Sequence, residues 1–221
     1  MVNRVIVLTL GFDEKFAVRA LTRAAPLEGD EVIVVMPSDG DERAKRALES
    51  LRRFCDTIGI SLNVKEVPVA KPEEAIAEVY KVLSQRLREG KVLRLNLSGG
   101  MRALILETLI AALAATRQWP DSMLSTKVEV DLENLKGVVE LTLGHFALSL
   151  PGSIDLDILR SIKKLQALGN ATLDMIASEA KIPRSTTYRR LLDLERRGYV
   201  KAEKRRRRVV YSLTELGDMW A

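Results

Sequence analysis

Short β-rich runs alternate with helical patterns through the first 142 residues, and this alternation limits the folds open to the chain. Arg4–Leu10 and Glu31–Met36 are almost continuously apolar, as expected of strands buried on both faces of a parallel sheet. Between the runs, apolar residues recur every three or four positions, which indicates helices that cover such a sheet. Because parallel neighbours need crossover helices, this order predicts an α/β, Rossmann-like, doubly wound sheet. The expected strands are 4–10, 31–36, 62–67, 91–97, 127–131 and 137–143, and the expected helices are 13–24, 41–57, 72–87 and 101–119.

The chain changes character at residues 143–153, where Pro151, Gly152 and Ser153 follow one another. Residues 151–221 contain 15 Lys and Arg against 9 Asp and Glu, a net charge of +6, whereas the whole chain carries +5. A basic excess confined to the last third indicates a module that binds a polyanion, with a solvated basic surface as the alternative. We therefore expect one domain over 1–143, a linker over 144–153 and a basic, helix-rich domain over 154–221.

Composition excludes several classes of protein. One Cys cannot form a disulfide framework, and one Cys with one His cannot supply a four-ligand zinc site, so we expect no metal. The start has no secretory signal, and the longest apolar stretch, 103–115, is too short to span a bilayer, so we expect no membrane partner. A cytoplasmic, reducing location follows. Cys55 is expected in the core, and His145 in the linker has no catalytic partner.

Three helical patterns follow residue 154, and the third, from Pro183 to Arg197, carries the polar chemistry. Thr187, Leu191 and Leu194 share one face of it and are expected to be buried. The other face offers hydroxyl and guanidinium groups, which can reach base edges in the major groove of DNA. Duplex DNA fits better than RNA, because the A-form major groove excludes a helix. These polar residues are Arg184, Ser185, Thr186, Tyr188, Arg189 and Arg190.

A basic hairpin is expected after that helix. Two β-rich runs, 199–202 and 209–213, flank five basic residues and together predict a wing, whose tip can lie on phosphates or in a minor groove. A basic run in isolation is equally a solvated turn. The segment I-P-R-S-T-T-Y-R-R-L-L-D-L-E-R-R-G-Y-V with this hairpin resembles the winged helix-turn-helix of bacterial and archaeal transcription regulators. The five basic residues are Lys204, Arg205, Arg206, Arg207 and Arg208.

In the first domain the most informative stretch is 96–102, N-L-S-G-G-M-R, between the fourth strand and the fourth helix. It lies at the carboxyl end of the predicted sheet, where doubly wound folds bind ligands. Two glycines let the backbone approach a ligand, and the amides of Gly99 to Arg102, with the Ser98 hydroxyl, can hold an anion. The alternative is a simple turn capped by Ser98. The chain has no dinucleotide fingerprint and no P-loop, so a Mg-bound triphosphate is not expected.

A strand ending in N-L-S-G-G-M-R before an apolar helix, in an α/β domain joined to a winged helix, resembles the CARF (CRISPR-associated Rossmann fold) family. The layout is similar to its archaeal transcription regulators of the Csa type. The resemblance covers essentially the whole chain and implies a homodimer that binds a cyclic oligoadenylate across its two-fold axis as an effector, without a cofactor. It also implies that the site is lined by Asn96, Leu97, Ser98, Gly99, Gly100, Met101 and Arg102, by Thr9, Leu10, Gly11 and Phe12, and by Pro37 and Ser38.

The chemistry fits a cyclic tetra-adenylate, because a two-fold site with Arg102 from each chain matches the charge of its internal phosphodiesters. The fourth helix is apolar nearly all round, which indicates burial in a core or a dimer contact. Phe12 is either a base-stacking residue or an apolar loop anchor. We expect a DNA-binding regulator and no catalytic residues. The alternatives are a ring nuclease, for which no general base is evident, and a regulator that senses another anionic metabolite.

Overall fold

A computed structural model describes residues 3–132, 136–146, 151–167, 169, 171–205 and 208–221. The chain divides into two compact units, residues 1–147 and 148–221, each of which is described by itself. The division falls inside the segment expected as the linker. In that segment the structure has a short helix, α6 (Leu143–Phe146), which contains His145, and α7 begins at Ser153.

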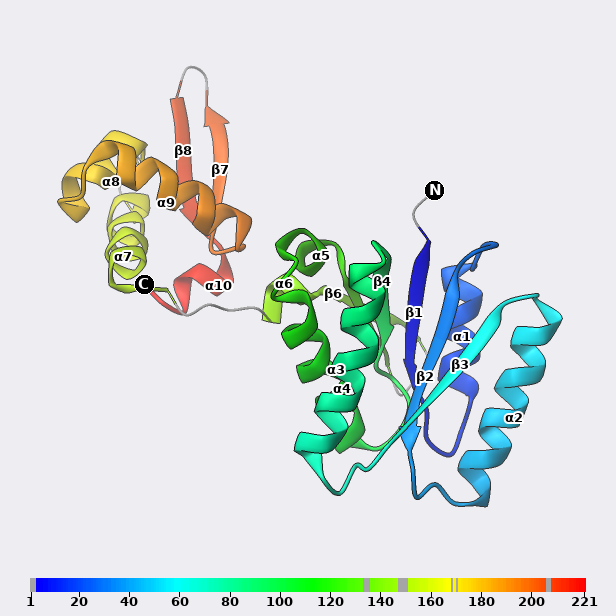
Figure 1. Cartoon of the computed structure of the whole chain (residues 1–221). Helices are drawn as coiled ribbons and strands as arrows, with labels where there is room; N and C mark the ends of the chain where they lie inside the picture. Colours follow the sequence, from blue (N-terminus) through cyan, green and yellow to red (C-terminus); the bar gives the residue numbers. More distant parts are fainter. Residues whose placement is uncertain (1–2, 133–135, 147–150, 168, 170, 206–207) are drawn as a thin grey trace. The chain divides into compact units, whose positions relative to one another are not determined.

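The first unit is built on a six-stranded sheet with the order β3-β2-β1-β4-β5-β6 (Figure 1). The first five strands are parallel and β6 pairs antiparallel with β5. This order confirms the predicted Rossmann-like sheet. The connection between β5 and β6 is too short for a crossover, so β6 reverses direction. The strands are β1 (Arg4–Thr9), β2 (Glu31–Pro37), β3 (Ser61–Val67), β4 (Val92–Asn96), β5 (Lys127–Asp131) and β6 (Val138–Thr142).

Helices cover both faces of this sheet (Figure 1). Val5 and Val7 of β1 pack into the core on the side of α3 and α4, whereas Ile6 and Leu8 pack on the side of α1 and α2. Successive side chains of a strand point to opposite faces, so a strand between two helical layers is apolar throughout. Cys55 lies in the second core, as predicted. The helices are α1 (Lys15–Ala24), α2 (Glu42–Thr57), α3 (Pro72–Arg88), α4 (Arg102–Thr116) and α5 (Pro120–Ser125).

The helix predicted over 101–119 is α4, which ends three residues earlier, at Thr116, and a short helix that was not predicted, α5, begins at Pro120. Proline disfavours helical angles in the residue before it, and Trp119 has φ −130° and ψ 83°. The helix therefore cannot continue through this point. Across the described residues, no helix combines the length and the apolar character needed to cross a lipid bilayer.

The second unit contains three main helices followed by a two-stranded antiparallel sheet. Thr187, Leu191 and Leu194 are buried on one face of α9, as predicted. Their burial against the preceding helices turns the opposite face of α9 outward. The arrangement confirms the predicted winged-helix fold. The elements are α7 (Ser153–Ala167), α8 (Leu173–Ala180), α9 (Arg184–Arg196), β7 (Val200–Arg205), β8 (Arg208–Leu213) and α10 (Glu215–Asp218).

Candidate functional site

The loops that follow β1 and β4 touch at the point where the strand order reverses. A Cβ atom on Gly99 would lie 2.6 Å from the carbonyl oxygen of Thr9, and one on Gly11 would lie 2.7 Å from Cα of Gly100. Gly100 also has a φ of 91°, which residues with a side chain rarely adopt. These glycines therefore allow two backbones to pack against each other, a role beyond the predicted close approach to a ligand.

The helix α4 begins directly after this contact. Its N-cap is Met101, whose side chain accepts no hydrogen bond, so the alternative of a turn capped by Ser98 is wrong. Among the described residues, none accepts a hydrogen bond from the amides of Arg102, Ala103 and Leu104, and none forms an ion pair with Arg102. An uncapped helix N-terminus and an exposed guanidinium group lie together here. This combination suits an anion.

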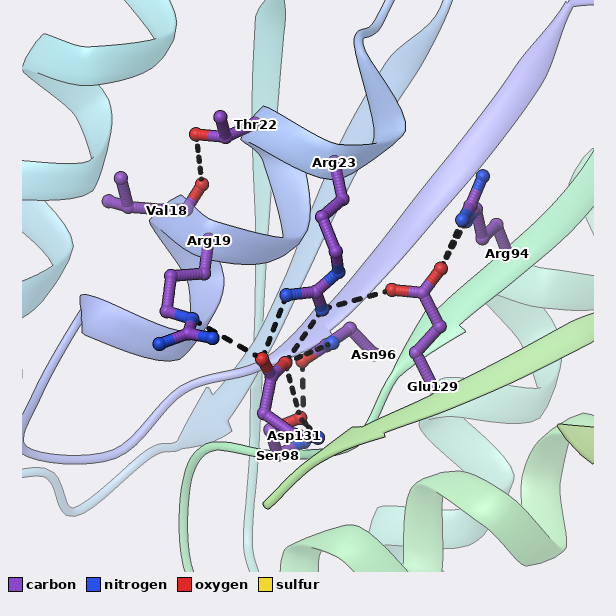
Figure 2. A network of polar contacts seen from close by, with 9 residues as sticks. All are labelled: Val18, Arg19, Thr22, Arg23, Arg94, Asn96, Ser98, Glu129 and Asp131. Carbon is purple, nitrogen blue, oxygen red and sulfur yellow. Dashed lines mark hydrogen bonds and ion pairs between the residues drawn. The ribbon is translucent and has the colours of Figure 1, made fainter. Parts of the chain in front are cut away.

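Beneath the loop, Ser98 is bound to Asp131 of β5 (Figure 2). The amide of Asp131 donates to Oγ of Ser98 at 2.7 Å, and the Ser98 hydroxyl donates to Oδ2 of Asp131 at 3.2 Å. Nδ2 of Asn96 donates to the same Oδ2 at 3.1 Å. Because the hydroxyl hydrogen of Ser98 is already used inside the protein, this side chain holds the loop in place.

Two arginines of α1 neutralise Asp131 (Figure 2). Nη1 and Nη2 of Arg23 donate to Oδ1 and Oδ2 at 2.8 and 2.7 Å, and Nε of Arg19 lies 3.4 Å from Oδ1. Burial by itself raises the pKa of Asp131, but the hydrogen bonds from Arg23, Asn96 and Ser98 outweigh burial and hold that pKa below its ordinary value. The carboxylate stays ionised and joins α1, β4 and β5 under the loop.

A cavity of about 400 Å³ lies beside the loop, with walls from the segments that follow β1, β2 and β4. Of the predicted residues, Gly11, Phe12, Pro37 and the range 98–101 line it. Sequence reasoning missed the other half of the wall, although one signal was available. All of the missed residues follow the carboxyl end of a parallel strand, where a doubly wound sheet gathers its ligand-binding residues. They are Asp13, Phe16, Asp39, Gly40, Asp41 and Ala44.

The predicted ligand residues differ in how far they are exposed to solvent. The Phe12 side chain is 55% exposed, and the guanidinium carbon of Arg43 lies 4.3 Å from the centroid of its ring. Ser38 is exposed, and its amide donates to the carbonyl of Val67 at 2.9 Å. Four of the predicted residues that do not line the cavity are buried, so their side chains contact protein and not solvent. These are Thr9, Leu10, Asn96 and Leu97.

In the second unit, α9 carries six of the eleven residues predicted to contact DNA. Nε of Arg184 lies 2.5 Å from Oδ1 of Asp174, in an ion pair that is exposed on both sides. Arg190 differs, because its Nη1 lies 3.6 Å from Oδ1 of the buried Asp155 and the side chain is directed into its own unit. Ser185, Tyr188 and Arg189 are exposed, and Thr186 is half-buried.

The hairpin of β7 and β8 brings basic residues to its end. Lys204, Arg205 and Arg208 are exposed, and the strand register pairs Arg205 with Arg208. Nη2 of Arg205 lies 3.1 Å from Oε2 of Glu203. Arg206 and Arg207, which were also predicted to contact DNA, lie outside the described residues.

Each of the two units is matched by the model of a known protein family. A family model described as the Csa3 CRISPR-associated Rossmann-like domain matches residues 4–142. A second model, described as the sugar-specific transcriptional regulator TrmB, matches residues 162–216. The CRISPR-locus DNA-binding protein Csa3 of Thermoproteus tenax is 27% identical over 202 residues, which cover 91% of this chain and 87% of that protein.

Solved structures with a similar fold include two proteins whose descriptions mention a cyclic nucleotide. Can2 from Sulfobacillus thermosulfidooxidans, in complex with cyclic tetra-adenylate, is 16% identical with a TM-score of 0.45, over 97% of this chain and 62% of Can2. A type III CRISPR defence DNA nuclease activated by cyclic oligoadenylate is 14% identical with a TM-score of 0.47, over 90% of this chain and 34% of the nuclease. The chain thus spans less than two thirds of either protein.

Proposed function

Because the chain belongs to the Csa3 CRISPR-associated Rossmann-like family, we propose that it is a DNA-binding regulator whose first unit senses a cyclic oligoadenylate. The name of the Thermoproteus tenax relative and the match to a transcriptional regulator over 162–216 support the DNA-binding part. The outward polar face of α9 and the basic hairpin supply the matching surfaces. A helix enters the major groove, and arginines of a wing contact phosphates.

The observation that carries the sensing part is the uncapped N-terminus of α4 with Arg102 beside it, at the edge of the cavity. The amides and the guanidinium group suit a phosphodiester, which carries one negative charge and two acceptor oxygens. The ordered loop beneath them rests on Ser98 and Asp131. A site that is held in place before binding loses less entropy when the ligand arrives.

A dimer is supported by the outer face of α4. Leu104 and Ala111 are buried against the sheet, whereas Leu106 and Ile110 on the other face are 59% and 48% exposed. One side of the helix therefore belongs to the core, and the other side leaves apolar side chains in solvent. This exposed side lies next to residues 97–101, the loop between β4 and α4, which we call the ligand loop. A second copy that covers this face around a two-fold axis would bring two anion sites to one symmetric ring.

Regulation requires that the ring bind differently to the DNA-competent and DNA-incompetent states of the dimer. The proposal needs no chemical step, and it assigns the ring the role of an effector. A ring nuclease remains an outcome that the test below distinguishes, because cleavage yields a linear product.

The test is a calorimetric titration of the full chain with cyclic tetra-adenylate. We expect one ring for two chains, and Arg102→Ala should weaken binding by about tenfold or more, because a charge-assisted hydrogen bond is removed. Arg117→Ala, an exposed arginine just after the other end of α4, is the control and should leave affinity unchanged. If the titration gives no binding heat at two temperatures and the ring causes no shift in the unfolding temperature, cyclic tetra-adenylate is not the ligand. Recovery of linear product over many turnovers would make the protein an enzyme.

A further inference from the structure

A buried carboxylate lies behind the DNA-binding helix of the second unit. Asp155, in the first turn of α7, is only 3% exposed. A carboxylate that is taken out of water is costly unless positive groups and hydrogen-bond donors surround it. The partners of Asp155 are the backbone directly before α7 and two arginines, Arg190 within α9 and Arg197 at its C-cap. This one side chain therefore joins the beginning of the unit to the helix that is expected to enter DNA.

The two oxygens of Asp155 have different partners. Oδ2 accepts from the amide of Gly152 at 3.2 Å and from Nη1 of Arg197 at 3.3 Å. The bond to Gly152, which lies just before α7, is of the kind that caps a helix N-terminus. Oδ1 is buried and accepts no hydrogen bond from the described residues, and Nη1 of Arg190 lies 3.6 Å from it, beyond hydrogen-bond distance. Arg190 therefore acts on this oxygen through its charge.

Arg197 is not placed to take over from Arg190. Its Nη1 donates to Oδ2 of Asp155 and also to Oδ2 of Asp193, the latter at 3.1 Å. Its guanidinium carbon lies 5.0 Å from the centroid of the Tyr199 ring, and the side chain is only 19% exposed. Because Arg197 is fixed by two carboxylates and an aromatic ring, it cannot follow Oδ1 if Arg190 leaves.

Arg190 lies where it could otherwise reach DNA. Its side chain is 42% exposed, and both Arg189 beside it and Thr186 one turn earlier are predicted to contact DNA. A guanidinium group on a phosphate gains a charge-assisted hydrogen bond, but in solvent, where salt screens the attraction. Departure of Arg190 would take positive charge from a buried carboxylate oxygen that already lacks a hydrogen bond, and this penalty exceeds the gain from a surface contact. We therefore expect Arg190 to stay with Asp155 when DNA binds.

We propose that Asp155 is a positioning residue that keeps Arg190 away from DNA phosphates. The inference rests on the proposed function and adds to it how tightly the second unit holds DNA of any sequence. Each phosphate contact strengthens binding to every sequence alike, whereas base contacts distinguish one sequence from another. With Arg190 turned inward, contacts from the outward face of α9 contribute a larger share of the affinity. Asp155 thus limits binding that is independent of sequence.

The test measures the slope of log affinity against log salt for the full chain and a fluorescent DNA duplex of arbitrary sequence. Asp155→Asn removes the charge that holds Arg190 and keeps the shape of the side chain. The slope should become steeper by about 0.9, the effect of one added phosphate contact. Asp155→Asn combined with Arg190→Gln should return to the slope of wild type. A purely structural role of Asp155 would weaken binding without this gain and return.

Asp157→Asn is the matched control, because it removes the same charge from an exposed residue of α7 whose partner is Arg160 of its own helix, at 3.9 Å. Its slope should equal that of wild type. A folded Asp155→Asn whose slope equals that of wild type or of Asp157→Asn would overturn the proposal.

Arg190→Gln alone decides the question if circular dichroism shows that Asp155→Asn does not fold. The slope of wild type should be kept, because Asp155 already holds this charge away from the phosphates. A slope that is less steep by about 0.9 would show that Arg190 contacts a phosphate, and the proposal would be wrong while DNA binding stands. Absence of DNA binding by wild type would instead overturn the proposed function, and this inference with it.

Discussion

Ser98 and Asp131 are joined by two hydrogen bonds in opposite directions, from the Asp131 amide to the Ser98 hydroxyl at 2.7 Å and from that hydroxyl to the Asp131 carboxylate at 3.2 Å. Because Asp131 ends β5 and Ser98 lies in the ligand loop, the pair sets the height of the loop above the sheet. The carboxylate is itself held by Arg23, so the loop is tied to α1 through a single buried charge.

Replacing Ser98 by Ala tests this anchor. The change removes both hydrogen bonds and leaves the Asp131 amide without its acceptor, so we expect a decrease of about 1–3 kcal/mol in the free energy of unfolding. Affinity for cyclic tetra-adenylate should fall as well, because the loop amides lose their support. Urea unfolding and calorimetry measure the two effects. Ser125→Ala is the control, since its hydroxyl donates only to the carbonyl of Ser122 in the same helix. Unchanged stability of Ser98→Ala would contradict the anchoring role.

Gly99→Ala tests the contact between the two loops. The new Cβ atom would lie 2.6 Å from the carbonyl oxygen of Thr9, so the backbones must move apart. We expect a cost of about 1–3 kcal/mol, the usual range for overpacking, together with weaker ring binding. Gly137→Ala is the control, because among the described residues its Cβ would meet Leu132 alone, at 3.5 Å, an ordinary contact. Equal unfolding midpoints for the two variants would show that the loops after β1 and β4 can move apart without a loss of stability.

The ion pairs of Glu31 make the stability of the first unit depend on pH in the acid range. Burial by itself raises the pKa of Glu31, but hydrogen bonds from Arg86 and Lys91 outweigh it and lower that pKa to about 2. Because the folded-state pKa lies below the ordinary value of 4.5, ionised Glu31 stabilises the fold above that pH, and this stability is lost as the pH falls toward 2. The full effect is about 3 kcal/mol.

Urea unfolding measured from about pH 5 down to about pH 2 checks this dependence. Glu31→Gln should be less stable near neutral pH and should lose part of the acid slope, because the charge that binds Arg86 and Lys91 is gone. Glu49→Gln is the control, since its carboxylate is exposed and lies 4.0 Å from Arg53. An acid slope that is the same in wild type and Glu31→Gln would refute the assignment.

The basic hairpin is tested by replacing Arg205–Arg208 with Ala. If these residues lie on phosphates, binding to every DNA sequence should weaken, and the slope of log affinity against log salt should decrease by about 0.9 for each phosphate that the hairpin no longer neutralises. Fluorescence anisotropy at several salt concentrations measures the slope. The control for the change in net charge replaces the same number of basic residues with Ala on the exposed face of α2, namely Lys45, Arg46, Arg52 and Arg53. A salt slope equal to that of wild type would show that the hairpin does not contact DNA phosphates.

Much of the fold could be predicted from local patterns. The apolar run Arg4–Leu10 and the helical spacing in 72–87 depend on neighbours a few residues apart, and the crossover rule then dictates a parallel sheet. The glycine motif 96–102 also lies where the sheet topology places ligands. The short helix α5 was missed, because its six residues from Pro120 to Ser125 are too few to show a helical period.

The partners inside the site were beyond the reach of the sequence. Arg23 and Asp131 are 108 positions apart and meet because the fold brings α1 and the end of β5 within hydrogen-bond distance of each other. Asp39 and Asp41 look alike in the chain, yet one caps α2 and the other has no donor among the described residues. Local sequence patterns were enough to predict most of the helices and strands and the edge of the sheet that holds the site. Which charge is neutralised and which stays available depends on long-range packing, because ion pairs form between side chains that the tertiary structure brings within a few ångströms.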